Sequence, residues 1–338
     1  MIALLLLSLL AGDFFVTGPD LAGRAAVTRT APGKARVRVT FAGFGKVKGG
    51  AVEGEGALDA SGRLLGFRGA RLGRVRIAGR AVAWTPAPAQ PFGILLVPGL
   101  STSHWNRAGI PYFDENLATL RALGFAARRI GLSTEAPVAD NAAGIAREIR
   151  AEAAAGRRPI VFAHSKGATE TIAALALDPG AAALVAGVVL LQPLYAGSPL
   201  ADLVDRHAAL ERAVALVFEK ALGGSRRAVL DMSFAVRGAF NAAHPYPAAR
   251  VPTVVVRSTF RRRLSKSLLW VNEKLIRKQL GLANDGMVTP RDAAVPGAAR
   301  TIDFDDLDHF EPALRNESRH TPVEITTRAM LALMPLVR

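Results

Sequence analysis

The sequence IVFAHSKGA occupies residues 160–168 and joins an apolar run, typical of a buried strand, directly to the start of a helix. Ser165 stands at the junction, with Ala163 two residues before it and Gly167 two residues after it. A turn this tight strains the backbone of its apex residue, exposes the side chain there and leaves room only for small neighbours. The pattern predicts a nucleophile elbow with Ser165 at its apex. Alanine in place of the usual first glycine costs one methyl group of clearance.

Strand and helix patterns alternate on both sides of this elbow. The predicted strands cover residues 93–97, 125–130, 159–163, 185–192, 253–258 and 301–304, and the predicted helices cover residues 114–123, 141–154 and 168–177. We expect each strand to be short and aliphatic on both faces, as in a sheet that helices cover on both sides. Residues 89–338 are therefore predicted to form an α/β domain with a mostly parallel sheet. Strand patterns disappear over about residues 194–249, which predicts a helical cap inserted into the domain.

A serine nucleophile needs a base that takes its proton and a carboxylate that orients the base. Asp285 lies in the tight loop ANDGMV, residues 283–288, and His309 lies in the segment DLDHF, residues 306–310, which follows the last predicted strand. Open parallel sheets bind their ligands at the carboxyl ends of the strands. The sequence thus predicts Ser165, Asp285 and His309 as the catalytic residues. Asp308 is a poor partner for His309, because adjacent side chains on an extended segment diverge.

An oxyanion hole needs two backbone N–H groups that point at the developing negative charge. Lys166, directly after the nucleophile, is predicted to supply one of them, and its side chain is expected at the surface or in contact with a head group. The loop VPGLS, residues 97–101, is predicted to supply the other from Leu100 or Ser101. Gly99 would let this loop turn close to the substrate, and His104 is a further candidate for lining the pocket. His164 is expected to point away from Ser165 and to make a structural hydrogen bond.

These motifs together resemble the α/β-hydrolase superfamily, and specifically its bacterial lipase and esterase-like serine hydrolases. The resemblance covers about residues 91–338 and rests on PGLS, AHSKGA, QPLYAGSPLADL, NDGMV and DLDHF. It implies the α/β-hydrolase fold with a helical cap that lines the acyl pocket. It also implies hydrolysis of carboxylic esters through an acyl-enzyme, with Ser165 as nucleophile, His309 as general base and then acid, and Asp285 as the orienting carboxylate.

The expected substrate is a small-molecule or lipid ester, and no cofactor is expected. A thioesterase or an acyltransferase would use the same triad, so these activities are alternatives within the enzyme class. The alternative outside it is a non-catalytic protein of the same fold that binds a membrane or an acidic polymer through a basic surface. The formal net charge of +15 suits such a partner, whereas the scattered arginines and the 6% of aromatic residues do not indicate nucleic-acid binding.

The remaining predictions concern the N-terminal part and metals. Residues 1–16 form an apolar segment that resembles a signal peptide or an anchor, which predicts export to the periplasm or the medium, or peripheral membrane attachment. Residues 24–88 carry a strand-and-turn pattern and no reactive cluster, so they are predicted to form a β-rich segment. The chain has no cysteine, which excludes thiolate chemistry. No histidine and carboxylate spacing suits a metal site.

Overall fold

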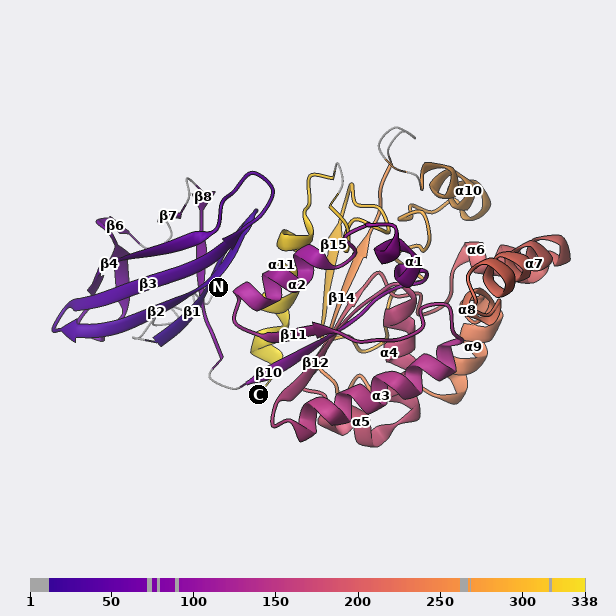
Figure 1. Ribbon diagram of the computed structural model, residues 1–338, viewed down its shortest axis with the longest axis horizontal. Coiled ribbons are helices and arrows are strands. Elements are labelled where there is room, and N and C mark those ends of the chain that lie inside the picture. Colours follow the sequence, from indigo (N-terminus) through magenta and orange to yellow (C-terminus); the bar gives the residue numbers. More distant parts are fainter. Residues whose placement is uncertain are drawn as a thin grey trace. The chain divides into compact units, whose positions relative to one another are not determined.

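The structure is a computed structural model that describes residues 12–71, 75–77, 80–88, 91–261, 267, 269–315 and 318–337. The chain divides into two compact units (Figure 1). Unit 1 comprises residues 1–90 with 118–125, and unit 2 comprises residues 91–117 with 126–338. Among the described residues, no helix combines the length and the apolar character that crossing a membrane requires.

Unit 1 is a seven-stranded antiparallel sheet with the strand order β6-β5-β4-β3-β2-β1-β9. Its strands are β1 (Gly12–Gly18), β2 (Leu21–Ala31), β3 (Lys34–Gly43), β4 (Gly50–Leu58), β5 (Leu64–Phe67), β6 (Ala70–Arg71) and β9 (Ala83–Pro86), beside the small pair β7 (Arg76–Ile77) and β8 (Arg80–Ala81). The β-rich N-terminal segment predicted from the sequence is confirmed. Of the predicted apolar segment, residues 1–11 lie outside the described residues, and residues 12–16 form most of β1.

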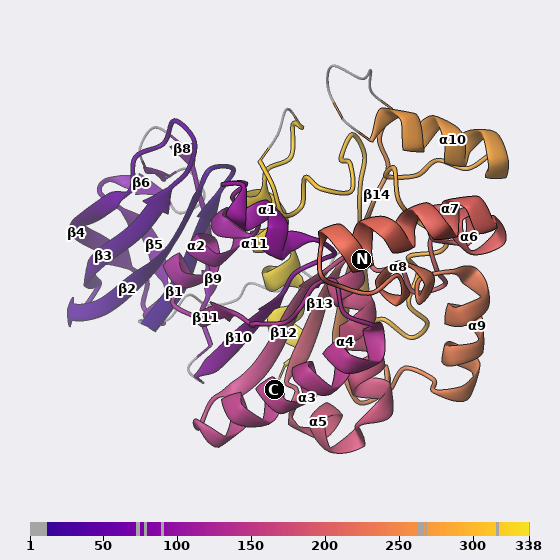
Figure 2. The ribbon, with the colours of Figure 1, turned by 45° about the vertical axis from the view of Figure 1, so that its right-hand side comes forward.

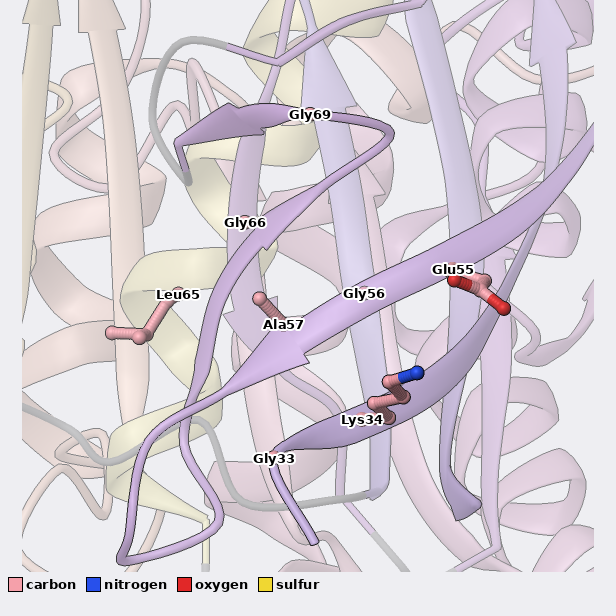
Figure 3. A pocket seen from close by; sticks show the side chains of 8 residues that line it. All are labelled: Gly33, Lys34, Glu55, Gly56, Ala57, Leu65, Gly66 and Gly69. Atoms are coloured by element: carbon pink, nitrogen blue, oxygen red, sulfur yellow. The ribbon is translucent and has the colours of Figure 1, made fainter. Parts of the chain in front are cut away.

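The sheet of unit 1 has one buried face and one exposed face. Along β3, the side chains of Val37 and Val39 are buried, whereas those of Arg36 and Arg38 are exposed. This alternation is what a strand needs when only one of its faces meets a core. Figure 3 shows a hollow on this sheet that is lined by Gly33, Lys34, Glu55, Gly56, Ala57, Leu65, Gly66 and Gly69. Lys34 and Glu55 are the charged groups of that lining.

Unit 2 contains a six-stranded parallel sheet with the strand order β11-β10-β12-β13-β14-β15. Its strands are β10 (Phe92–Val97), β11 (Ala126–Arg129), β12 (Arg158–His164), β13 (Gly187–Leu191), β14 (Thr253–Ser258) and β15 (Arg300–Phe304). The expectation that every strand is aliphatic on both faces is wrong for β11 and β15, which carry arginines and, in β15, Asp303. Both are edge strands with a neighbour on one side only, so less of their surface is covered.

Helices cover both faces of this sheet (Figure 2). Of these helices, α3 (Val138–Ala154), α4 (Lys166–Leu177) and α11 (Pro322–Leu333) contact strands of the sheet. The other α-helices described outside the cap are α1 (Thr102–Arg107), α2 (Asp114–Ala122), α5 (Pro179–Leu184) and α10 (Trp270–Leu280). Apolar residues of α3, α4 and α5 share one buried cluster with residues of β10, β12, β13 and β14. Helix α11 contacts β13, β14 and β15. The sequence pattern did not predict α1, α5 or α11.

The cap consists of short helices between β13 and β14, namely α6 (Pro199–Arg206), α7 (Ala208–Ala215), a π-helix (Leu216–Ala221), α8 (Arg227–Leu230) and α9 (Phe234–Ala243). Hydrogen bonds attach it to the loop before α3 and to the first residue of that helix. The N–H of Ser225 donates to the carbonyl oxygen of Glu135 at 2.9 Å, and the N–H of Val138 donates to Oδ2 of Asp231 at 2.9 Å. These contacts fix the cap to the body of unit 2 at its α8 end.

Candidate active site

Ser165 occupies the turn between β12 and α4 with a φ of 57° and a ψ of −128°. Positive φ is costly for a residue with a side chain, so the surrounding structure must hold it in place. The small neighbours explain how the turn fits. A Cβ atom on Gly167 would lie 2.3 Å from the carbonyl oxygen of Pro98, and Ala163 is fully buried at the end of β12.

His309 lies between Ser165 and Asp285. Its Nε2 atom is 2.7 Å from the hydroxyl oxygen of Ser165, and its Nδ1 atom is 2.8 Å from Oδ2 of Asp285. All three residues are buried, and the N–H of His309 also donates to the carbonyl oxygen of Asp285 at 2.9 Å. The structure therefore brings together the three residues that the sequence singles out, as a hydroxyl, an imidazole and a carboxylate in one line of hydrogen bonds.

The carboxylate of Asp285 is held as a hydrogen-bond acceptor by its own loop. The N–H groups of Met287 and Val288 each donate to its Oδ1 atom at 2.8 Å, which leaves Oδ2 for the ring of His309. Asp308 serves a different purpose. Its Oδ1 atom accepts hydrogen bonds from the backbone N–H groups that follow it, and its Oδ2 atom accepts one from Ser267 at 2.7 Å.

The loop after β10 lies against the nucleophile. A Cβ atom on Gly99 would be 3.0 Å from Cβ of Ser165 and 2.9 Å from the hydroxyl oxygen of Tyr112, so only glycine fits there without displacement. Ser101 has a φ of 60°, and Thr102 donates its hydroxyl proton to the carbonyl oxygen of Gly99 at 2.8 Å. The loop that carries Leu100 and Ser101 is thus close to Ser165. Lys166 is the first residue of α4, where a backbone N–H has no acceptor within the helix.

The side chain of Lys166 corrects an expectation, because it is buried and not at the surface. Its ammonium forms an ion pair with Glu170 one turn along α4, and Asn141 of α3 donates to the same carboxylate at 2.7 Å. Burial raises the pKa of Glu170 to about 7, against the lowering effect of Lys166 and Asn141. The expectation failed because α3 covers the first turn of α4, which the local sequence does not reveal.

His104, a candidate for lining the pocket, is anchored to a carboxylate that the sequence did not single out. Its Nδ1 atom lies 2.9 Å from Oε1 of Glu135, which also accepts hydrogen bonds from the hydroxyl groups of Ser103 and Thr134. Burial would raise the pKa of Glu135, but these hydrogen bonds together lower it. The group joins α1 to the loop before α3, at the point where the cap is attached.

His164 makes structural hydrogen bonds, as the sequence predicts, but its partners were not foreseen. Its ring contacts Tyr112, Gln192 and the backbone carbonyl group of His309. Tyr112 lies in an irregular segment without a motif, and Gln192 follows β13 as the first residue of the segment QPLYAGSPLADL, for which the sequence predicts no hydrogen-bonding role. Among the described residues, no group of three or more histidine and carboxylate side chains is arranged to hold a metal ion.

Solved structures of esterases and lipases are similar to this chain. A metagenomic carboxyl esterase matches with a TM-score of 0.61 and 23% identity, over 73% of this chain and 77% of its own. The mature lipase of Bacillus licheniformis matches with a TM-score of 0.55 and 27% identity, over 75% of this chain and 94% of its own. Lipase 1 of Pelosinus fermentans matches with a TM-score of 0.55 and 12% identity, over 72% of this chain and 99% of its own.

No family model matches the sequence, and the search of curated proteins finds no match. The fold and its structural neighbours nevertheless define the class. The chain is an α/β-hydrolase-fold protein. Within that fold it resembles bacterial carboxyl esterases and lipases, as the sequence motifs predict.

Proposed function

We propose that this protein hydrolyses carboxylic esters, with Ser165 as nucleophile, His309 as general base and acid, and Asp285 as the carboxylate that orients His309. The observation that carries the proposal is the pair of contacts at the imidazole of His309. One is 2.7 Å to Ser165 and the other is 2.8 Å to Asp285, and both lie within hydrogen-bond reach. The esterase and lipase neighbours support the same reaction class.

The first half of the reaction forms an acyl-enzyme. The hydroxyl oxygen of Ser165 attacks the ester carbonyl carbon while its proton passes to Nε2 of His309, and the carbonyl oxygen becomes an oxyanion. Asp285 accepts the Nδ1–H of His309 and stabilises the imidazolium. The tetrahedral intermediate then breaks its bond to the alcohol oxygen, which takes the proton from Nε2. The acyl group stays on Ser165.

The second half returns the enzyme to its starting state. A water molecule gives a proton to Nε2 of His309 and its oxygen attacks the acyl carbon, and the new intermediate expels the oxygen of Ser165, which recovers the proton. One ester and one water give one acid and one alcohol. The backbone N–H of Lys166 and that of Leu100 or Ser101 would stabilise the oxyanion in both halves, because these groups flank the nucleophile.

Apolar side chains beside the triad favour an ester with an apolar acyl group. The ring of Trp105 packs edge-on against that of Phe310, the residue after His309, with the centroids 4.6 Å apart. Leu100, in the loop beside the nucleophile, packs against a buried apolar cluster of the cap that contains Leu194 and Met232. An acyl chain that lies against these residues would bury apolar surface, which favours longer chains.

The test is hydrolysis of p-nitrophenyl acetate and p-nitrophenyl laurate by the purified protein. We expect turnover of both esters, a lower KM for the laurate, and loss of turnover in Ser165→Ala. Ser61→Ala, which removes a hydroxyl from a turn in unit 1, is the matched control and should retain full activity. Parallel assays with an acyl thioester and with an added alcohol acceptor distinguish a thioesterase or an acyltransferase. Equal inertness of the wild type and Ser165→Ala on every substrate would contradict the proposal.

A further inference from the structure

A chain of buried hydrogen bonds runs behind the triad, from the loop at Gly99 to the backbone of His309. The N–H of Gly99 donates to the hydroxyl oxygen of Tyr112 at 3.2 Å, and this hydroxyl contacts Nδ1 of His164. The other ring nitrogen of His164, Nε2, lies 2.8 Å from the carbonyl oxygen of His309. Tyr112 and His164 are 2% and 1% exposed, so solvent does not compete for these bonds.

The direction of each bond follows from the groups at the two ends of the chain. A backbone carbonyl oxygen only accepts, so the proton on His164 must sit on Nε2, which faces the carbonyl group of His309. Burial, together with the neighbouring His309, lowers the pKa of His164 to about 3, so the ring is neutral and Nδ1 is an acceptor. The hydroxyl of Tyr112 therefore donates to Nδ1 and accepts from the N–H of Gly99.

Gln192 supports the same arrangement from the end of β13. Its Oε1 atom accepts from Nε2 of His164 at 3.1 Å, and its Nε2 atom donates to the carbonyl oxygen of Asp308 at 3.1 Å. That carbonyl group also only accepts, which fixes the orientation of the amide. Backbone carbonyl groups of two consecutive residues, Asp308 and His309, are thus held by side chains from the ends of β12 and β13.

We propose that Tyr112 and His164 are positioning residues, an inference that rests on the proposed function. They hold the loop of residues 97–101 and the backbone of His309 in fixed positions relative to Ser165. Neither residue takes part through its own chemistry in the proposed reaction, because both act through backbone groups of Gly99 and His309. The packing at Gly99 makes the coupling tight, since a Cβ atom there would meet both the hydroxyl oxygen of Tyr112 and Cβ of Ser165. A loop that loses Tyr112 is free to move away from the nucleophile.

A positioning role predicts a loss of kcat with little change in KM. Loss of an interaction that acts mainly in the transition state lowers kcat, whereas loss of one that binds substrate and transition state equally raises KM. A small displacement of catalytic groups costs about 100-fold in rate. For Tyr112→Phe, which removes one hydroxyl and keeps the ring, we expect kcat on p-nitrophenyl butyrate to fall roughly 10- to 100-fold with KM unchanged within about twofold.

Tyr246→Phe is the matched control, because Tyr246 is also a buried tyrosine whose hydroxyl has a side-chain partner, Thr253 at 2.8 Å. It should keep the wild-type kcat, although it loses a buried hydrogen bond of the same kind. A general effect of lost stability would lower the activity of both variants alike. Circular dichroism and thermal unfolding establish that each variant is folded at the assay temperature.

A second experiment compares kcat of two variants of His164, and it tests the proposal even if Tyr112→Phe folds poorly. In His164→Gln the side-chain amide can still donate to the carbonyl oxygen of His309, whereas His164→Leu keeps the bulk and loses the donor. We expect His164→Gln to retain at least about tenfold more kcat than His164→Leu.

The proposal is overturned if Tyr112→Phe matches Tyr246→Phe in kcat, if its loss lies in KM alone, or if His164→Gln and His164→Leu are equally active. An inert wild type with no fluorophosphonate labelling would instead contradict the proposed hydrolase activity. The two failures are therefore distinguishable.

Discussion

A Cβ atom on Gly167 would lie 2.3 Å from the carbonyl oxygen of Pro98, so the first turn of α4 rests directly on the backbone of the loop after β10. The proposed oxyanion hole takes its N–H groups from this same helix start and loop. A methyl group at this position must push the helix and the loop apart. Residue 167 is therefore a site where added volume should disturb both stability and the proposed oxyanion hole.

Gly167→Ala should lower the free energy of unfolding by about 1–3 kcal/mol through overpacking and should reduce ester hydrolysis more than the change in stability explains. Gly238→Ala is the control, because Gly238 lies on an exposed part of α9 with no atom within 4 Å of an added Cβ. That variant should gain about 0.5–1 kcal/mol from the helix propensity of alanine. Urea unfolding and initial rates on p-nitrophenyl butyrate measure the two effects. A fully active, equally stable Gly167→Ala would contradict the packing described above.

Asp285→Asn should lower kcat by about a thousandfold or more while the protein stays folded, because the amide keeps the shape but no longer stabilises the imidazolium of His309. Asp308→Asn should retain activity within about tenfold, since the carboxylate of Asp308 bonds to Ser267 and to backbone N–H groups and not to the ring of His309. Its effect should fall on thermal stability. Equal loss of kcat in the two variants would contradict the assignment of Asp285 as the partner of His309.

The buried histidine predicts acid lability of the fold. Burial and the neighbouring His309 lower the pKa of His164 from 6.5 to about 3. Below about pH 6.5 the unfolded chain binds a proton at His164 and the folded chain does not. The contribution of His164 to the free energy of unfolding is therefore complete above that pH and is lost as the pH falls towards 3. The loss is about 1.4 kcal/mol per pH unit within the window.

This acid loss should be reduced in His164→Gln relative to the wild type, when the free energy of unfolding is measured in urea between pH 8 and pH 4.5. His207→Gln, which removes an exposed histidine of the cap, should follow the wild-type profile. Parallel profiles for the wild type and His164→Gln would show that His164 is not the group responsible.

The buried ion pair of Lys166 and Glu170 predicts a strong non-additivity. Lys166→Met leaves the carboxylate of Glu170 without its ammonium partner and should cost about 3 kcal/mol, whereas the double variant with Glu170→Met should recover most of that loss. Chemical unfolding of the two single variants and the double variant gives the coupling energy. Additive effects would mean that the two side chains do not interact energetically.

Much of the fold was predictable because its signals are local. The apolar runs at β10, β12, β13 and β14 predict buried strands, and the small residues around Ser165 predict a tight turn. The order of Ser165, Asp285 and His309 along the chain selected them, because parallel strands end at one edge of the sheet. Ser165 and His309 follow β12 and β15, whereas Asp285 is separated from β14 by α10. These predictions needed no knowledge of which side chains meet.

The rest depended on contacts between distant segments. Lys166 resembles a surface lysine in its own sequence context, and only the position of α3 beside the first turn of α4 reveals that its ion pair with Glu170 is buried. Tyr112 lies far from His164 in the chain, in a segment without periodicity. Glu135 likewise gains two of its partners, Ser103 and His104, from α1. Such buried polar groups follow no local pattern, because hydrogen bonding across the fold decides whether their burial is tolerated.

The most direct test of the assignment of Ser165 and His309 as the catalytic pair uses a fluorophosphonate, which reacts with an activated serine. The measured quantity is the site of covalent modification. The wild-type protein is incubated with the reagent, digested, and analysed by peptide mass spectrometry, beside Ser165→Ala and His309→Ala. We predict one adduct on Ser165 in the wild type and none at that position in either variant, because the hydroxyl of Ser165 depends on His309 for its reactivity. An adduct on another serine, or undiminished labelling of Ser165 in His309→Ala, would contradict the claim that these two residues form the catalytic pair.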